Sequence, residues 1–466
     1  MMKFNIKHLM FLFALAFAFS SCQEYLDVND DPNRAQDVPF ENLLPTVIER
    51  SSAAHYSIAR SSGAITQQIG FNSGGYPAVI TSDGAWIAAY LHVFPNCVEL
   101  IDKANTLGAW QYAGIAQVLM AENLGLLSDS WESVPYSEAL KSTNNLTPAY
   151  DSQMALYRDI NSLLDDAIIN LNKTSAYEVS EAGDLIYHGD IAKWLRVAYT
   201  LKARYALHLS NKGLNNQEIL DDYIDNGLQS NGDDWELGYN EINNNSWYIV
   251  AKNNNTGNYS VDIGGYIVYL LKTNNDPRLY SIVDTNGLNG AEPVGASPAG
   301  LPYGSDAHNT PFKETTTWLS NINSPYQFLT FAEAKFIEAE VAFPVDKAIA
   351  YQAYLDGIAA NMDKMGVDGS AYLADPAVAV GMDNLTISLI MKEKYKATYL
   401  MPETWVDMRR YNYDANIYTD FAIPDPDSLI NGAIYRMDYP SSELSRNSNE
   451  VNKVIKPNIE KMWRDQ

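Results

Sequence analysis

Aromatic side chains in turn-rich segments are the residues of this chain whose types are best suited to binding chemistry. The 466 residues include 31 tyrosines and 9 tryptophans. An aromatic ring offers a large apolar face on which the C–H face of a sugar can stack, while neighbouring amide and charged groups bond the hydroxyls. We expect rings in helices to be buried, and rings beside Gly, Asn and Pro to be available to a ligand. The ligand-binding candidates are Tyr76, Trp131, Trp235, Trp247, Tyr248, Tyr259, Tyr303 and Trp318.

Local patterns for catalysis or metal binding are not found in the sequence. It contains no HExxH, GxSxG, GxGxxG or phosphate-binding loop, and its dispersed histidines and single cysteines do not suit a local zinc site. The segment DTNGLNG at 284–290 begins like a calcium loop, but Gly295 stands where that loop needs a carboxylate. We therefore expect no catalytic residue, no metal ion and no cofactor. The alternative, a hydrolase whose two carboxylates meet only in the fold, stays open.

A cysteine directly behind a short apolar segment indicates how the protein is exported. Lys3 and Lys7 precede an uncharged run at 9–19, and the sequence AFSSC follows it. Such a run rises only about 16 Å as a helix, roughly half of a bilayer's hydrocarbon core. We interpret residues 1–21 as a signal peptide. The SSC junction resembles a bacterial lipoprotein signal, which implies that Cys22 is acylated.

The charge balance restricts the partners of the remaining chain. The full sequence has 32 basic and 57 acidic side chains and a net charge of −25, and removal of residues 1–21 takes away two lysines and makes the charge more negative. Phosphate groups would be repelled, so we expect no nucleic-acid partner. An anionic lipid surface would be repelled too, so membrane attachment must come from the acyl chains on Cys22. Cys97, the only other cysteine, lies in an apolar-periodic stretch, and we expect it to be a buried free thiol.

Helical periodicity supplies the scaffold that positions these residues. Apolar residues recur every three or four positions over 154–171 and 348–366. A further helix is expected between Asp190 and Gly213, which are suited to cap its start and its end. Further helices are expected over 41–70, 85–106, 109–125, 328–343 and 386–400. The helices over 328–343 and 348–366 form a hairpin near the size of a tetratricopeptide unit.

The range 227–325 has a different composition from the helical segments. Asn, Gly, Pro and aromatic residues crowd together there, and this favours turns over long helices. We predict a mostly α protein with tetratricopeptide-like helix pairs as scaffold and an irregular, loop-rich ligand face. Residues 22–40 are a polar tether, and 41–466 form a single domain. The ligand site is expected on the irregular face, with help from the loops at 71–77 and 129–136.

Six segments in collinear order resemble the SusD/RagB family of surface lipoproteins, in its shorter SusD-like branch. They are SC-x₃-LDVNDDPN, AWIAAYLHVFPNCVELI, DSWESVPYSEAL, FLTFAEAKFIEAEVAF, KEKYKATYLMPETWVDMRRYNY and IYRMDYPSSELSRNSNEV. In the third segment Glu132 stands where the family more commonly has Gly. Within ETWVDMRR, the helical spacing of Glu403, Asp407 and Arg410 indicates an internal ion-pair network more than a ligand clamp.

The resemblance implies a function as well as a fold. It implies a non-catalytic lipoprotein, anchored in the outer membrane and facing outward, that captures an oligosaccharide and passes it to a partner TonB-dependent, SusC-like transporter. Relatives that capture peptides are the first alternative. A structural or adhesion lipoprotein that binds another protein through its helix repeats is the second.

Overall fold

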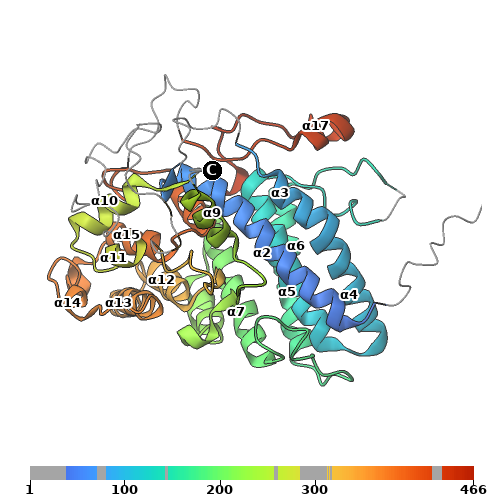
Figure 1. Ribbon diagram of the computed structural model, residues 1–466, viewed down its shortest axis with the longest axis horizontal. Coiled ribbons are helices and arrows are strands. Elements are labelled where there is room, and N and C mark those ends of the chain that lie inside the picture. Colours follow the sequence, from blue (N-terminus) through green and yellow to red (C-terminus); the bar gives the residue numbers. More distant parts are fainter. Residues whose placement is uncertain are drawn as a thin grey trace, which may run out of the picture.

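The computed structural model describes residues 38–70, 80–141, 145–256, 261–283, 312, 314, 317–421 and 433–466. This part of the chain is mostly α-helical (Figure 1), and its strands form two small two-stranded sheets. The expected fold class is confirmed. Among the described helices, none combines the length and the apolar composition that a membrane crossing requires.

The first half of the fold is a group of long helices around α5 (Trp110–Trp131), on the right of Figure 1. Every residue of α5 from Tyr112 onward is buried. Its close packing on the next helix depends on Gly114, because a Cβ there would lie 2.7 Å from Leu171 Cγ. The surrounding helices are α2 (Phe40–Ile65), α3 (Asp83–Ile87), α4 (Phe94–Leu107) and α6 (Gln153–Leu171), with the π-helical turn η1 (Ala88–Val93) between α3 and α4.

The second half is joined to the first by α7 (Ile191–His208), which begins at the Asp190 cap that the sequence predicts. Helices α12 (Phe331–Ala342) and α13 (Lys347–Lys364) form the expected hairpin. The expected helix over 328–343 starts later than predicted, because Thr330 accepts a hydrogen bond from the Glu333 N–H and caps it. The residues before this cap belong to the strand β4 (Tyr326–Leu329). Helices α15 (Ile387–Ala397) and α16 (Glu403–Arg410) complete this half.

The range 227–325 contains more regular structure than its composition suggests. Its described part holds β2 (Trp235–Leu237), α9 (Ser246–Asn255), β3 (Asp262–Ile263), α10 (Gly265–Thr273) and α11 (Leu279–Ile282). Strand β2 pairs antiparallel with β4, and β1 (Ile69–Gly70) pairs antiparallel with β3. The strands therefore connect this range to both halves of the scaffold.

The described ranges also contain several short elements. They are η3 (Ser210–Lys212), α8 (Asn216–Glu218), the π-helical turn η4 (Ile219–Ile224), η5 (Asn231–Asp233), α14 (Ser370–Leu373), η7 (Met382–Asn384), α17 (Ser441–Arg446), α18 (Ser448–Val451) and η8 (Trp463–Asp465).

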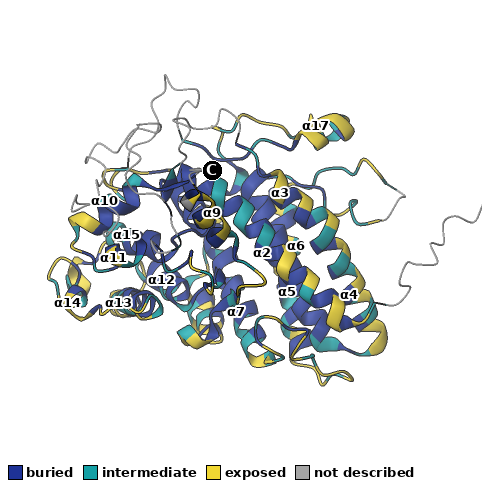
Figure 2. Ribbon diagram, viewed as in Figure 1, coloured by how far each residue is buried: buried dark blue, intermediate teal, exposed yellow. Residues whose placement is uncertain are grey.

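Burial is concentrated along the central helices, whereas α14, α17 and the outer side of α4 are exposed (Figure 2). Cys97 lies in this core as a free thiol, and burial raises its pKa. The expectation of a buried free thiol is confirmed.

Candidate ligand-binding face

Three of the eight candidate rings, Tyr76, Tyr259 and Tyr303, lie outside the described residues. The same holds for Cys22 and for the calcium-like segment at 284–290. Five candidate rings can therefore be placed in the fold.

Trp131 and Trp235 are fully buried, so the expectation that they face solvent is wrong. Trp131 is the last residue of α5, where its indole N–H donates to the Asp438 carbonyl at 2.9 Å. Trp235 stacks on Phe328 across the two strands, with ring centroids 4.8 Å apart. Both rings contribute apolar area to the core, where burial of an aromatic side chain stabilises the fold by about 2–3 kcal/mol. They are framework residues.

Trp247 and Tyr248 are also buried, which corrects the expectation of a loop at this position. Both belong to α9, which forms because the Asn245 side chain accepts a hydrogen bond from the Trp247 N–H at 2.8 Å. The Trp247 ring is 2% exposed and meets the edge of Tyr56, with centroids 4.9 Å apart. An asparagine run that suggests a turn here provides a helix cap instead.

Trp318 is half-buried and lies beside α11, which carries an exposed ring. The Trp318 N–H donates to the Ser281 carbonyl at 3.1 Å, so the backbones of the two segments are in direct contact. On α11, Leu279 and Ile282 are buried while Tyr280 is 72% exposed. These two neighbouring segments offer ring surface to a ligand. Tyr239 and Tyr269, elsewhere in the irregular range, are half-buried like Trp318, but Tyr280 is far more exposed.

Sequence reasoning missed Tyr280 because it lies in the apolar segment LYSIV. The signal was present, however. Leu279 and Ile282 are three positions apart, and that spacing turns both toward the core of a helix and leaves Tyr280 outside.

A polar groove of about 550 Å³ opens beside the first turn of α7. One wall consists of residues 185–188 with Lys193, and the opposite wall contains Asn240 and Asn243. Strand β2 and η5 supply the lining between the walls. The volume lies within the roughly 300–1,000 Å³ usual for small-molecule sites.

A second hollow, of about 380 Å³, lies between α6, α7 and η4. Met154, Leu164, Leu209 and Trp463 contribute to its lining. These hydrocarbon surfaces suit apolar side chains better than hydroxyl groups, so this hollow is not our candidate for a sugar.

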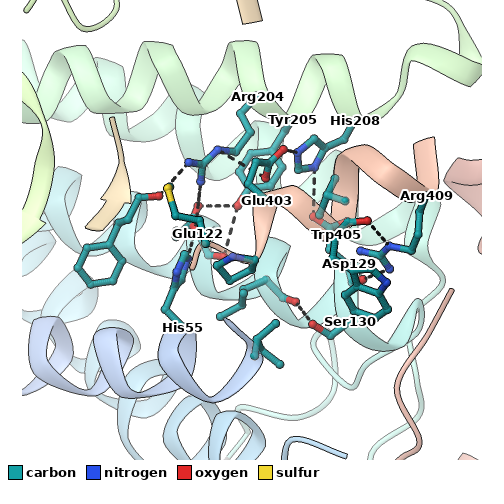
Figure 3. A pocket seen from close by; sticks show the side chains of 16 residues that line it. His55, Glu122, Asp129, Ser130, Arg204, Tyr205, His208, Glu403, Trp405 and Arg409 are labelled. Carbon is teal, nitrogen blue, oxygen red and sulfur yellow. Dashed lines mark hydrogen bonds and ion pairs between the residues drawn. The ribbon is translucent and has the colours of Figure 1, made fainter. Parts of the chain in front are cut away.

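A cluster of charged side chains inside the scaffold encloses a cavity much smaller than the groove and the second hollow (Figure 3). The cavity measures about 20 Å³, which is room for one water molecule. Arg204 Nε lies 2.7 Å from Glu333 Oε1, and His55 Nε2 lies 2.7 Å from Glu122 Oε1. Burial alone would raise the pKa of Glu122, but Arg204 and His55 outweigh it and lower that pKa. A closed and internally neutralised cluster of this kind supports the fold and cannot admit a ligand.

Helix α16, which carries ETWVDMRR, is part of the same buried framework, with all eight residues buried. Arg410 Nη2 lies 2.7 Å from Asp407 Oδ1, and the Arg409 guanidinium lies 3.6 Å from the centroid of the Trp405 ring. Asp407 also pairs with Lys394 at 2.8 Å. The prediction of an internal ion-pair network is confirmed for this segment.

Within the described ranges, no three His, Cys, Asp or Glu residues are grouped so that they could hold a metal ion.

Comparison with known proteins relates this architecture to a family. The SusD-like family model, described as starch-binding and associating with outer membrane, matches residues 62–440. A SusD homologue from Bacteroides uniformis shares 17% identity and a TM-score of 0.76, with 92% of this chain and 100% of that chain covered. A SusD/RagB family protein from Bacteroides thetaiotaomicron shares 23% identity and a TM-score of 0.69, with coverages of 92% and 99%.

A chitin-binding SusD homologue from Flavobacterium johnsoniae is similar as well, with 19% identity, a TM-score of 0.70 and coverages of 92% and 98%. The search of curated proteins gives no match to the chain. At these identities the solved structures establish the fold, and the family model spans most of the sequence. The chain therefore belongs to the SusD-like family.

Proposed function

We propose that this protein captures a glycan at the cell surface and delivers it, without catalysis, to a TonB-dependent transporter in the outer membrane. The observation that carries the proposal is the family match over 62–440, since that family is one of nutrient-binding proteins associated with the outer membrane. The exposed Tyr280 beside the half-buried Trp318 gives such a function a physical basis on the irregular face.

The ligand contacts the ring of Tyr280 and the open part of Trp318. Each ring provides an apolar face for sugar C–H groups, and an aromatic pair costs little conformational entropy to hold in place. The Trp318 N–H is bonded to the carbonyl of Ser281, the neighbour of Tyr280, so the two segments that carry the rings are held together before the ligand arrives.

Isothermal titration calorimetry tests the ring surface. The mature chain with Cys22→Ala is titrated with maltooligosaccharides and chitooligosaccharides, then compared with Tyr280→Ala and Trp318→Ala combined. We expect the double variant to lose about 2 kcal/mol of binding, roughly thirtyfold in Kd. Tyr177→Ala is the matched control, because Tyr177 is also an exposed ring, at 45%, on a different segment. Unchanged affinity in the double variant, with a normal melting curve, removes these rings from the site.

The same titration with a peptide library separates glycan capture from peptide capture. If the wild-type protein binds peptides and no oligosaccharide, and the double variant loses the peptide binding, the protein would be assigned to peptide uptake.

Anchoring by Cys22 and delivery to a transporter have their own tests. Protease added to intact cells should digest the wild-type protein, and Cys22→Ala should release it from the membrane fraction. Purification from detergent-solubilised membranes should recover a TonB-dependent transporter with the wild-type protein. If the protease spares the wild-type protein on intact cells, the outward orientation is wrong.

A further inference from the structure

The groove beside α7 does not include Tyr280 or Trp318 in its lining, and it reaches the segment that follows Trp318 only at Pro325. We propose that it is a second binding site, and that its ligand is an uncharged, hydroxyl-rich molecule of the neutral oligosaccharide class. The inference goes beyond the proposed function, which uses the ring surface alone.

The wall at 185–188 is fixed in place before any ligand binds. The buried carboxylate of Asp184 accepts hydrogen bonds from the N–H groups of Ile186 at 3.1 Å, Tyr187 at 3.2 Å and Gly189 at 3.0 Å. It also accepts one from the Trp194 indole at 2.8 Å. One buried group thus holds the loop against the first turn of α7.

The same loop holds His188 in an unusual backbone conformation. His188 has φ +52°, in the left-handed region that non-glycine residues rarely adopt, and its side chain is exposed. Backbone of this kind persists only where surrounding contacts fix it, and it is common at ligand sites.

The opposite wall is a fixed turn. The Asn240 side-chain oxygen accepts from the N–H groups of Ile242 at 2.9 Å and Asn243 at 3.1 Å. Asn243 itself is exposed in the groove. Because both walls are held by such bonds, a ligand would lose little affinity to ordering of the protein.

The charged groups at the groove all have partners within the protein. Lys364 Nζ lies 3.0 Å from Asp234 Oδ2 and 2.6 Å from Glu236 Oε2. Lys193 Nζ donates to the Gly232 carbonyl at 2.7 Å and lies 5.6 Å from the centroid of the Tyr187 ring. Lys364, which is not itself part of the lining, pairs with both carboxylates, whereas the partners of Lys193 are a carbonyl and a ring. With two lysines and two carboxylates, the groove has no excess of either charge to attract an ionic ligand.

The surfaces that remain match an uncharged sugar. The Asn243 amide and the His188 imidazole can bond hydroxyl groups, and Leu185, Pro325 and the open backbone at Gly238 provide apolar contact for C–H groups. An anionic saccharide would meet Asp234 and Glu236, and a cationic one would meet Lys193. The groove thus favours neutral ligands over both.

Filling the groove tests this site directly. Gly238 lines the groove, and an added Cβ there meets nothing within 4 Å, so Gly238→Trp adds an indole at the groove without a clash at Cβ. Gln352→Trp, on the exposed side of α13, is the matched control. The probes are maltotriose and N-acetylated chitotriose, with trigalacturonate and the deacetylated chitosan trimer as charged counterparts of similar size. Binding to the mature chain is followed by calorimetry and by saturation-transfer NMR.

We expect the neutral trisaccharides to lose at least tenfold affinity for one class of site in Gly238→Trp and to keep it in Gln352→Trp. We expect the charged probes to bind that site at least tenfold more weakly. The Tyr280→Ala and Trp318→Ala double variant should retain the groove component, so a failure of the ring surface and a failure of the groove give different results. The inference would be overturned if Gly238→Trp removes no binding of either neutral probe. It would also be overturned if a charged probe binds in the groove as tightly as a neutral one.

Discussion

His208 and Glu403, 195 residues apart in the sequence, are joined by a buried contact of 2.7 Å between Nε2 and Oε1. The contact connects the last turn of α7 to the first turn of α16. Asp129 of α5 lies 3.1 Å from the other ring nitrogen of the same histidine. A protonated His208 would therefore form ion pairs with two carboxylates on two different helices.

The stability of the protein should depend on pH through this histidine. Burial opposes protonation of His208, but Glu403 and Asp129 outweigh burial and raise its pKa above the ordinary value of 6.5. A raised pKa means that the folded state binds the proton more tightly than the unfolded state. The contribution of His208 is fully present below about pH 6.5 and is lost as the pH rises through the folded pKa. Thermal unfolding followed from pH 5 to pH 9 should show a decline on the alkaline side.

The carboxylates give the opposite slope at low pH. Burial alone would raise the pKa of Asp129 and of Glu403, but the neighbouring cations lower both. Their stabilising contribution is present above the pKa values of the unfolded state and is lost as the pH falls through the pKa values of the folded state.

The variant His208→Gln tests the histidine and should remove much of the alkaline decline in stability. A variant whose melting temperature falls with pH as steeply as the wild type would contradict the role of His208.

Cys97 should resist alkylation in the folded protein. Its thiol is fully buried, and burial raises its pKa, so little thiolate is formed near neutral pH. In the Cys22→Ala mature chain, mass spectrometry after iodoacetamide treatment should show no added mass in buffer and one adduct in denaturant. Rapid labelling in buffer would place the α4 region outside the core.

Gly114 should be the residue of α5 that tolerates a side chain least well on the side facing α6. A Cβ at this position would lie 2.7 Å from Leu171 Cγ and 3.1 Å from the Ala167 carbonyl oxygen. Gly114→Ala should therefore destabilise the protein by about 1–3 kcal/mol, as overpacking of a core does. Gly238→Ala is the control, with no atom near its added Cβ, and it should stay within about 0.5 kcal/mol of the wild type. Equal denaturation midpoints for the two variants would contradict the close packing of α5 on α6.

Long periodic segments of the sequence predict their helices closely, whereas ends that depend on tertiary partners are not predicted. The pattern over 154–171 corresponds to α6 at Gln153–Leu171. Helix α5, expected to end near residue 125, continues to Trp131, because the polar residues that suggest a loop are satisfied inside the core. Asp129 forms ion pairs there with His208 and Arg464, which are distant from it in the sequence.

The binding rings illustrate the same difference between local and distant information. Composition placed Trp247 in a loop, but a hydrogen bond from the Trp247 N–H to the Asn245 side-chain oxygen starts a helix that buries the ring. Tyr280 is exposed because of a helix only four residues long, and the ring beside it belongs to a segment 38 positions later. A single sequence indicates which residue types can bind a sugar, but the contacts between distant segments decide which rings stay open.

Arg204 should be the most costly charged residue to remove from the scaffold. It lies on α7 and binds Glu333 of α12 through Nε at 2.7 Å and Nη2 at 2.8 Å, and its Nη1 lies 3.3 Å from Glu122 of α5. All three side chains are buried. Arg204→Met leaves two buried carboxylates without their main cation, so we expect a loss of about 3–5 kcal/mol in the free energy of unfolding.

The double variant Arg204→Met with Glu333→Gln should recover part of that loss, because one unpaired charge is removed together with its partner. Arg158→Met is the control, because it makes the same substitution at an arginine outside the buried cluster. Its side chain is 77% exposed, and its pair with Asp159 contributes at most about 1 kcal/mol. Urea unfolding of the four proteins measures these differences. If Arg204→Met and Arg158→Met shift the midpoint equally, the buried cluster does not hold the three helices together.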